Sequence, residues 1–178
     1  MERVIYMISE KMEKAINEQI NAELYSSYLY LSMSAWFSDH SLDGCAHWMR
    51  AQAQEELMHA MKFYDYLIER GGKVVVSGID APPTTWKSPL DVFEYTYSHE
   101  QKVTGLIHDL VNLAISKKDH ATTTFLNWFV SEQVEEEASA DEIVQKLRLI
   151  KDSSSGLFMI DRELGTRVSS APSTQEEP

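Results

Sequence analysis

The chain has 178 residues, which is enough for one domain with a sizeable core. Its 28 acidic and 16 basic residues give a net charge of −12, which argues against a nucleic-acid partner because phosphate binding requires a basic surface. The single cysteine excludes an intrachain disulfide framework and a zinc site built from four cysteines.

The first residues, MERVIYMISEKMEK, lack the apolar run of a secretory signal, and no stretch approaches the ~18 consecutive apolar residues of a membrane span. We therefore expect a cytoplasmic protein with no membrane partner. Apolar residues then recur at steps of four and seven from Ser9 to Phe37, which predicts a long helix with Ser9 as its N-cap. A second helix is predicted from about Asp43 to Arg70.

The segment 71–88 begins with two glycines, which end a helix, and carries no helical pattern of its own. Ser88-Pro89-Leu90-Asp91 then supplies an N-cap, a first-turn proline and an acid three residues after the cap, and predicts a third helix to about Ser116. A fourth helix is predicted over about 121–151 and a short fifth over 157–164. We expect residues 1–167 to form one domain and the polar segment 168–178 to be a disordered tail.

The lengths of these helices predict their arrangement. A helix of thirty residues spans about 45 Å, and two such helices joined by a few residues must lie antiparallel. The segment 71–88 can reach about 60 Å when extended, which is enough to run the length of a bundle. The sequence therefore predicts an all-α fold: a four-helix bundle with one long crossover between the second and third helices, which run parallel, and a short C-terminal fifth helix.

Four glutamates interrupt the apolar faces of these helices. Glu23, Glu56, Glu100 and Glu136 each lie seven residues from apolar neighbours on both sides, so they share the inward face, and His59 follows Glu56 by three residues. A single acid in an apolar stripe is commonplace, but carboxylates are almost never fully buried unless they are paired or bind a cation. One inward glutamate on each helix would bring four repelling carboxylates together, and two divalent ions would relieve that repulsion.

The ligand types favour iron or manganese, because oxygen donors with one imidazole suit these ions better than copper or zinc. The fourth helix carries no second Glu-x-x-His, since Ser139 lies three residues after Glu136. It carries instead the acidic run SEQVEEE, in which Glu132 lies one turn before Glu136, and Glu55 adjoins the inward glutamate of the second helix. These extra carboxylates could hold a third, weaker metal, although Glu135 fits a solvated acidic face equally well.

Four segments resemble the motifs of nonhaem ferritins of the bacterial and archaeal type: NAELYSSYLY, AQEELMHAMKF, YSHEQ and FLNWFVSEQVEEE. They occur in the order and spacing of that family, and the likeness covers residues 5–167. The resemblance implies iron storage with ferroxidase activity, in which dioxygen or peroxide oxidises Fe(II) at a dinuclear iron centre and a shell holds the ferric mineral. It also implies that this shell is a homo-oligomer of 24 subunits.

Carried over residue by residue, the resemblance implies two main iron sites that share Glu56 as a bridge. The ligands of site A would be Glu23, Glu56 and His59. The ligands of site B would be Glu56, Glu100 and Glu136, with Gln133 alongside. A possible third site would use Glu55, Glu132, Glu135 and Glu136. Tyr30 and Trp128 match aromatic positions near the centre, and a redox role for Tyr30 draws its main support from this resemblance.

Several positions depart from related families. Bacterioferritins bind haem through a methionine directly after the bridging glutamate, but Leu57 stands at that position here, so we expect no haem. Animal ferritins line their threefold pores with acids where this chain has Thr123 and Leu126, and they nucleate mineral at acids where it has Met58 and Met61. The resemblance therefore assigns neither the iron entry route nor the nucleation site.

The remaining histidines have no partner at ligand spacing, and we expect each of them at the surface or at an interface: His40, His47, His99, His108 and His120. Cys45 is predicted to be partly buried at a helix start. Aromatic side chains on faces flanking the predicted core favour a large homo-oligomer, because a lone bundle should expose less apolar surface; they are Trp48, Tyr64 and Tyr66.

Two other functions remain open on the residues alone. A diiron oxidase or catalase-like enzyme would act on small molecules without storing metal, although the missing second Glu-x-x-His argues against it. A metal-free acidic bundle would be purely structural. The iron content of the purified protein distinguishes the three functions.

Overall fold

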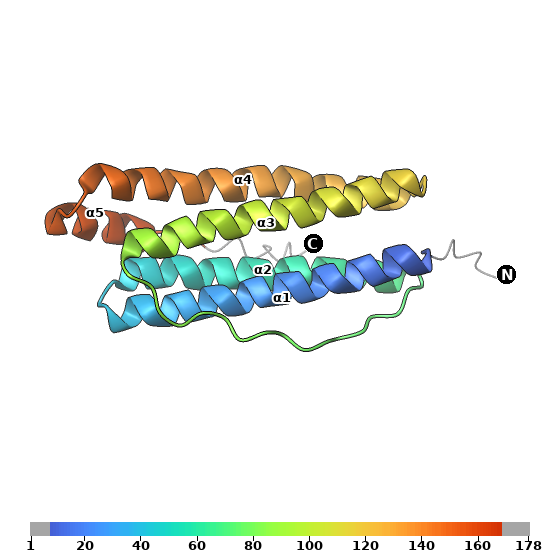
Figure 1. Cartoon of the computed structure of the whole chain (residues 1–178), viewed down its shortest axis with the longest axis horizontal. Helices are drawn as coiled ribbons and strands as arrows, with labels where there is room; N and C mark the ends of the chain where they lie inside the picture. The colour runs from blue at the N-terminus through green and yellow to red at the C-terminus, as the bar shows by residue number, and fades with distance from the viewer. Residues whose placement is uncertain (1–7, 169–178) are drawn as a thin grey trace, which may run out of the picture.

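The computed structural model describes residues 8–168 and confirms the all-α fold. Within this range the chain forms five helices and no strand: α1 (Glu10–Asp39), α2 (Asp43–Glu69), α3 (Pro89–Ser116), α4 (His120–Ile150) and α5 (Ser154–Leu164). The four long helices form two antiparallel pairs, α1 with α2 and α3 with α4, and α5 packs at the end of the bundle where α4 finishes (Figure 1). Among the described residues, no helix has the continuous apolar length that a membrane span requires.

The segment 71–88 runs back along the outside of the bundle, so that α2 and α3 point the same way, as predicted (Figure 1). Two asparagines of α1 hold this crossover in place. The side chain of Asn17 donates to the carbonyl oxygen of Lys73 at 2.9 Å and accepts from the amide of Val75 at 2.7 Å. One turn later, Asn21 donates to the carbonyl oxygen of Gly78 at 3.0 Å. These bonds pair backbone groups of the crossover that have no helix or strand partner within residues 8–168.

The helix boundaries follow local capping signals. Ser9 and Ser88 accept hydrogen bonds from backbone amides three residues later, at 3.3 and 3.1 Å, as the sequence predicted for N-caps. Gly71 follows α2 with a φ of 71°, a conformation that glycine adopts without strain. Helix α5 begins three residues before the predicted residue 157, because Ser153 caps it through the amide of Gly156 at 3.1 Å.

The core consists of two apolar clusters, one toward each end of the bundle. The cluster nearer α5 draws side chains from all five helices, including Phe37, Trp48 and Phe93. The second cluster includes Phe63 and Phe129, whose rings stack with centroids 4.1 Å apart. Between the two clusters most inward positions are polar, and the predicted metal ligands lie there.

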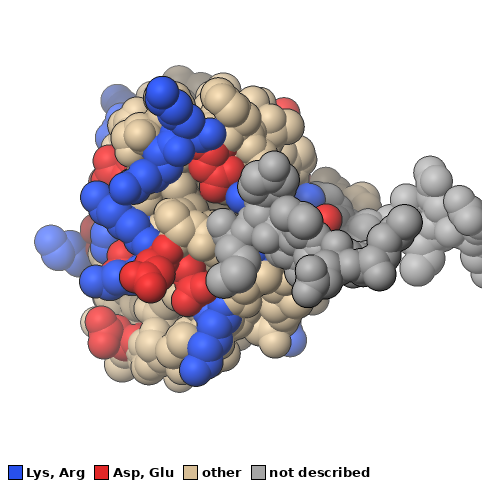
Figure 2. Space-filling view, turned by 90° about the vertical axis from the view of Figure 1, so that its right-hand side faces the viewer, with Lys and Arg blue, Asp and Glu red and all other residues tan. Residues whose placement is uncertain are grey.

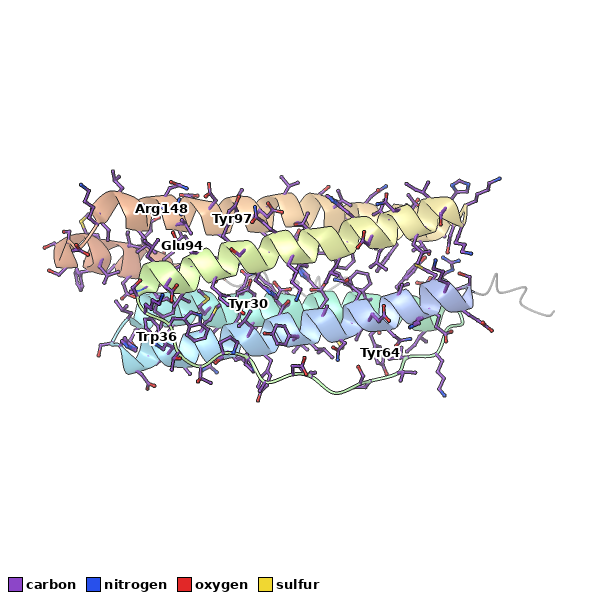
Figure 3. All side chains as sticks on the ribbon, viewed as in Figure 1. Tyr30, Trp36, Tyr64, Glu94, Tyr97 and Arg148 are labelled. Carbon is purple, nitrogen blue, oxygen red and sulfur yellow. The ribbon has the colours of Figure 1, made fainter. Side chains whose placement is uncertain are left out.

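Helix α5 docks against the start of α2 through a close backbone contact. A Cβ atom added to Gly44 would lie 1.7 Å from the carbonyl oxygen of Asp161, so only glycine fits at this position. The amide of Cys45 donates to Asp161 Oδ1 at 2.8 Å. Toward the same end of the bundle, Arg148 of α4 pairs with Glu94 of α3 at 2.7 Å (Figure 3). The contacts of Gly44 and Cys45 fix α5 against α2, and residues 165–168 follow beside that helix.

Two predictions about single side chains were wrong, those for His99 and Cys45. Trp48 is 4 % exposed and packs in the core, so it adds nothing to an exposed aromatic surface, whereas Tyr64 and Tyr66 are half-buried. His99 was expected at the surface or at an interface but is 8 % exposed within the bundle, because the buried face of α3 is wide enough to include it. Cys45 is fully buried rather than partly buried. The other four histidines are exposed, as predicted.

The end of the bundle where α3 finishes and α4 begins carries charges of both signs. Figure 2 shows lysine and arginine side chains interspersed with aspartate and glutamate over the described part of this end. Arg70 and Asp119 form an ion pair here at 3.2 Å. Leu126 is fully buried in the core and Thr123 is half-buried. Neither side chain is acidic, so these two positions supply no carboxylate at this end of the bundle.

Candidate metal centre

The four inward glutamates meet midway along the bundle, between the two apolar clusters. Each lies on a different long helix, from Glu23 on α1 to Glu56, Glu100 and Glu136 on α2, α3 and α4. Their exposed fractions are 1, 2, 1 and 7 % in that order, and His59 on α2 is 3 % exposed. The fold thus brings five ionisable side chains into one buried layer.

Two groups of three residues offer ligand atoms close enough to share an ion. The first group is Glu23, Glu56 and His59, the second is His59, Glu132 and Glu136, and the atoms within each lie within 4.8 Å of one another. His59 belongs to both groups. Its Nδ1 lies 3.4 Å from Glu56 Oε2, and its Nε2 lies 3.9 Å from Glu132 Oε1. The His59 imidazole therefore lies between Glu56 in the buried layer and Glu132 on the outer side of the centre.

The carboxylate of Glu100 is oriented by Tyr30 and Gln133. The Tyr30 hydroxyl donates to Glu100 Oε1, and Gln133 Nε2 donates to Glu100 Oε2 at 3.2 Å. Tyr30 is fully buried on α1 within the bundle (Figure 3), and its ring centroid lies 6.0 Å from that of His99. His99 Nε2 is hydrogen-bonded to Ser26 Oγ at 2.8 Å. These contacts fix Tyr30 at one edge of the centre.

Two buried glutamines that the sequence did not single out also support the carboxylates. Gln19 Nε2 donates to Glu23 Oε1 at 2.8 Å. Gln52 Nε2 donates both to Glu56 Oε1 at 3.0 Å and to Glu136 Oε2 at 2.7 Å. Each glutamine lies four residues before the inward glutamate of its own helix, and that spacing is the signal that could have found them. Gln52 thereby joins α2 to α4 and holds two carboxylates that would otherwise repel each other.

Burial raises the pKa values of the four inward glutamates. Desolvation, followed by the charge of Glu56, raises the pKa of Glu23 from 4.5 to about 8. Desolvation also raises the pKa values of Glu100 and Glu136 to about 7, and it raises that of Glu56 well above its usual value. The pKa of Tyr30 is raised well above 10, first by desolvation and then by Glu100. Near neutral pH the metal-free centre therefore retains protons that a divalent ion has to displace.

The donor set fits a hard divalent ion such as Fe(II). Glu23 Oε2 and Gln52 Oε1 are buried and have no hydrogen-bond partner within residues 8–168, although buried polar atoms are almost always paired. An ion bound among the glutamates would give Glu23 Oε2 a partner, and a water bound to that ion could donate a hydrogen bond to Gln52 Oε1. Carboxylates with one imidazole suit iron and manganese.

The remaining predicted ligands lie on the outer side of the centre. The Glu132 side chain is 29 % exposed, and Glu135 is exposed. Glu55 is 7 % exposed, and its Oε2 accepts a hydrogen bond from Arg167. Within the described chain, Glu135 belongs to neither group of close ligand atoms. The structure therefore brings Glu132, but not Glu135, to His59.

A groove of about 520 Å³ opens beside these acids between α2 and α4, and Glu55, His59 and Glu132 contribute to its lining. Trp128, also in the lining, is 40 % exposed and meets the His59 ring edge-on at 5.4 Å between centroids. The Lys62 ammonium lies 3.8 Å from the centroid of the Trp128 ring. The centre thus approaches solvent on this side of the bundle.

Comparisons with known proteins point to one family. The family model described as "Ferritin-like domain" matches residues 13–150. The chain belongs to the ferritin family. This ferritin is 52 % identical over 161 residues to a "Bacterial non-heme ferritin" of Bacteroides fragilis, with 90 % of this chain and 100 % of that protein covered. It is 42 % identical over 160 residues to a "Bacterial non-heme ferritin" of Escherichia coli, with 90 % and 97 % covered.

The structural likeness of this ferritin is equally extensive. It matches the open pore ferritin of the archaeon Archaeoglobus fulgidus with a TM-score of 0.90 and 55 % identity, over 90 % of this chain and 98 % of that one. The predicted family and fold are therefore confirmed, whereas the individual ligand assignments stay predictions. Leu57, which directly follows Glu56, is 46 % exposed on α2.

Proposed function

We propose that this ferritin binds two Fe(II) ions as substrate at the buried centre and oxidises them there. Glu23, Glu56 and His59 would hold one ion, and Glu56, Glu100 and Glu136 would hold the other, so that Glu56 bridges the two. Gln133 lies alongside the second position, 3.2 Å from the Glu100 carboxylate. Iron is the substrate and cargo of this centre rather than a permanent cofactor.

Membership of the ferritin family indicates the function that this centre serves. Bacterial non-haem ferritins store iron and are ferroxidases, and this chain belongs with them over 90 % of its length. The function is therefore iron storage with ferroxidase activity. Fe(II) is oxidised at the dinuclear centre, and the ferric product is held as mineral inside a shell.

The observation that carries the proposal is the burial of five converging ionisable groups with an unsatisfied ligand oxygen among them. Glu23 Oε2 has no hydrogen-bond partner in the described chain, and the three carboxylates of Glu23, Glu100 and Glu136 have pKa values of about 7 to 8. Such a cluster is costly for the folded state unless protons or cations compensate it. A purely structural bundle gains nothing from this arrangement, whereas a metal centre requires it.

The reaction needs close ions, an oxidant and protons. Dinuclear sites hold their metals about 3.5–4 Å apart. Each Fe(II) gives one electron to dioxygen, which takes up two protons and leaves as hydrogen peroxide. Carboxylate ligands favour Fe(III) over Fe(II) and so promote the loss of the electrons. The glutamates release protons when iron binds, so protons are available at the centre.

The chain's own residues orient the ligands for this step. Tyr30 and Gln133 each donate to a different oxygen of Glu100, so the position of that carboxylate is fixed on both sides. Gln52 holds one oxygen of Glu56 and one of Glu136. Ligands held in this way need little rearrangement when iron binds.

A third, weaker iron position would lie on the groove side and use Glu55, Glu132, Glu135 and Glu136. The close approach of ligand atoms of His59, Glu132 and Glu136 supports it, as does the opening of the groove at Glu55 and Glu132. This position would lie between the dinuclear centre and the solvent of the groove, where oxidised iron can leave.

The assembly that we propose is a cytoplasmic shell of 24 subunits. Exposed apolar side chains near the C-terminal end support subunit contacts: Leu149, Phe158 and Met159 are 82, 61 and 71 % exposed. Each subunit contributes a net charge of −12, and the field of such an assembly would attract cations.

Iron content and native mass, measured together after expression in iron-replete cells, test this function. An iron-storage ferritin gives a large assembly that contains many iron ions per subunit. A content of about two ions per subunit would instead indicate a diiron oxidase without storage. A protein without iron that also fails to bind Fe(II) under anaerobic conditions would be a structural bundle, and the proposal would be wrong.

A further inference from the structure

Residues 165–168 follow α5 and lie against α2, where Arg167 holds them. Its guanidinium lies 4.4 Å from the centroid of the Trp48 ring and donates to the Trp48 carbonyl oxygen at 3.4 Å. The carbonyl oxygen of Arg167 is hydrogen-bonded to His47 Nε2 at 2.8 Å. A second guanidinium nitrogen donates to Glu55 Oε2. Arg167 is thus held by an aromatic face, two backbone–side-chain bonds and a carboxylate.

The carboxylate that pairs with Arg167 is that of Glu55, which belongs to the acidic group beside the dinuclear centre. Glu55 directly precedes Glu56. Desolvation is the main reason that the pKa values of Glu132 and Glu136 are raised, and the charge of Glu55 adds to that rise in both. Glu55 and Glu132 also line the same groove. The positive side chain of Arg167, in the C-terminal segment 165–168, therefore lies beside the carboxylates that the third iron position would use.

We propose that Arg167 sets the affinity of the third position by competing with the metal for the carboxylate of Glu55. This inference rests on the proposed function, because it requires a cation on the outer side of the centre. A guanidinium and a carboxylate form a charge-assisted pair, and the side chains of Arg167 and Glu55 are only 19 and 9 % exposed. A metal that takes Glu55 has to displace this pair.

The competition has a structural consequence. When a metal occupies Glu55, Arg167 keeps its contacts with Trp48 and His47 but loses its ion pair. The C-terminal segment is then held less firmly against α2. Filling the third position therefore loosens residues 165–168, whereas filling the two inner positions leaves them in place.

The alternative is that Arg167 only anchors the end of the chain. In that case its replacement would lower the thermal stability of the protein without changing the binding of any metal. The test must therefore measure metal affinity and not stability alone.

Anaerobic calorimetric titration of the full-length assembly with Fe(II), and in parallel with Zn(II), makes this measurement. In Arg167→Gln the first two equivalents should bind as in wild type, and the later, weaker equivalent should bind about tenfold more tightly, the scale of one well-formed ion pair. Arg162→Gln is the matched control, because Arg162 lies exposed in the last turn of α5. It should titrate as wild type does. In Glu55→Gln the weak equivalent should weaken, and adding Arg167→Gln should not restore it.

Hydrogen–deuterium exchange on the wild-type protein supplies a measurement that needs no variant. The amides of residues 165–168 should exchange faster after the third equivalent of Zn(II) is added, and not after the first two. A weak equivalent unchanged in Arg167→Gln, with exchange that does not respond to metal, would overturn the role of Arg167 while leaving the dinuclear centre intact. A wild-type protein that lacks the first two equivalents would instead overturn the proposed function itself.

Discussion

Replacing Glu56 by glutamine removes one charge from the middle of the centre and keeps the shape of the side chain. Gln52 Nε2 can still donate to the remaining carbonyl oxygen, as it now does to Glu56 Oε1 at 3.0 Å. The new amide group can donate to Glu23, whose Oε2 lacks a hydrogen-bond partner in the part of the chain that the structure describes. We therefore expect the variant to fold and assemble.

The expected gain in stability follows from the burial of Glu56. This side chain is 2 % exposed, and desolvation, then the charges of Glu100 and Glu136, raise its pKa well above the usual value. Removing the charge should stabilise the metal-free protein at pH 8 by about 1–2 kcal/mol. That corresponds to an increase of about 2–8 °C in Tm for a chain of this size. The gain should shrink at lower pH, because protonation already removes the charge.

Metal should reverse this ranking. Zn(II), a redox-inert substitute for Fe(II), stabilises the wild type by about 2.7 kcal/mol at one hundred times its Kd. The variant lacks the bridging carboxylate at both positions, so it should gain much less. It should also lose the fast phase of Fe(II) oxidation.

The assay compares thermal unfolding of the wild type and Glu56→Gln at one scan rate, with and without Zn(II), and adds stopped-flow oxidation of Fe(II). Glu18→Gln is the matched control, because the Glu18 side chain is 69 % exposed on α1. It should behave as the wild type does in every arm. The reasoning is refuted if Glu56→Gln is less stable without metal, responds to Zn(II) like the wild type and oxidises iron as fast. Glu56 would then be an ordinary buried residue that binds no metal.

Three further predictions concern the protons, the glutamines and the outer acids. The metal-free protein should become less stable as the pH rises from about 6.5 to 8, because Glu23 and its neighbours bind more protons in the folded state, with pKa values of about 7 to 8, than in the unfolded state, with 4.5. Denaturant titrations at each pH measure this change, and a rise in stability from pH 6.5 to 8 would contradict it. Below pH 6.5 the buried His99, whose pKa is lowered to about 4, makes the folded protein more stable as the pH rises, which is the opposite effect. Gln52→Leu removes the donor shared by two carboxylates and should weaken binding of the first two Zn(II) ions by about 10–100-fold. Calorimetry that shows unchanged affinities would exclude Gln52 from the centre. Glu132→Ala combined with Glu135→Ala should leave rapid oxidation of the first two irons largely intact and alter later turnover or the oxygen consumed per iron. If the fast phase disappears, these residues belong to the main centre.

The long helices and their ends were predictable because the signals that set them are local. Ser88 caps α3 and Pro89 opens it, and these roles depend only on the residues that follow within one turn. The inward phase of Glu23 and Glu56 also follows from helical period alone. The parallel course of α2 and α3 followed from the length of the segment between them.

The surroundings of the centre were less predictable because they depend on how the helices dock. His99 was expected at the surface or at an interface, yet it packs against Ser26 of α1 and is buried. Gln52 looked like any polar helix residue, and its role became visible when α2 and α4 brought two carboxylates to it. Arg167 lies 112 residues from Glu55 in sequence, and no periodicity connects them.

Anomalous diffraction from crystals of the assembled protein loaded anaerobically with Fe(II) tests the central claim most directly. We predict two strong iron peaks inside each bundle, about 3.5–4 Å apart. One peak should contact Glu23, Glu56 and His59, and the other should contact Glu56, Glu100 and Glu136. Peaks confined to the outer acids, or a bundle without any iron peak, would contradict the claim that these buried glutamates form a dinuclear ferroxidase centre.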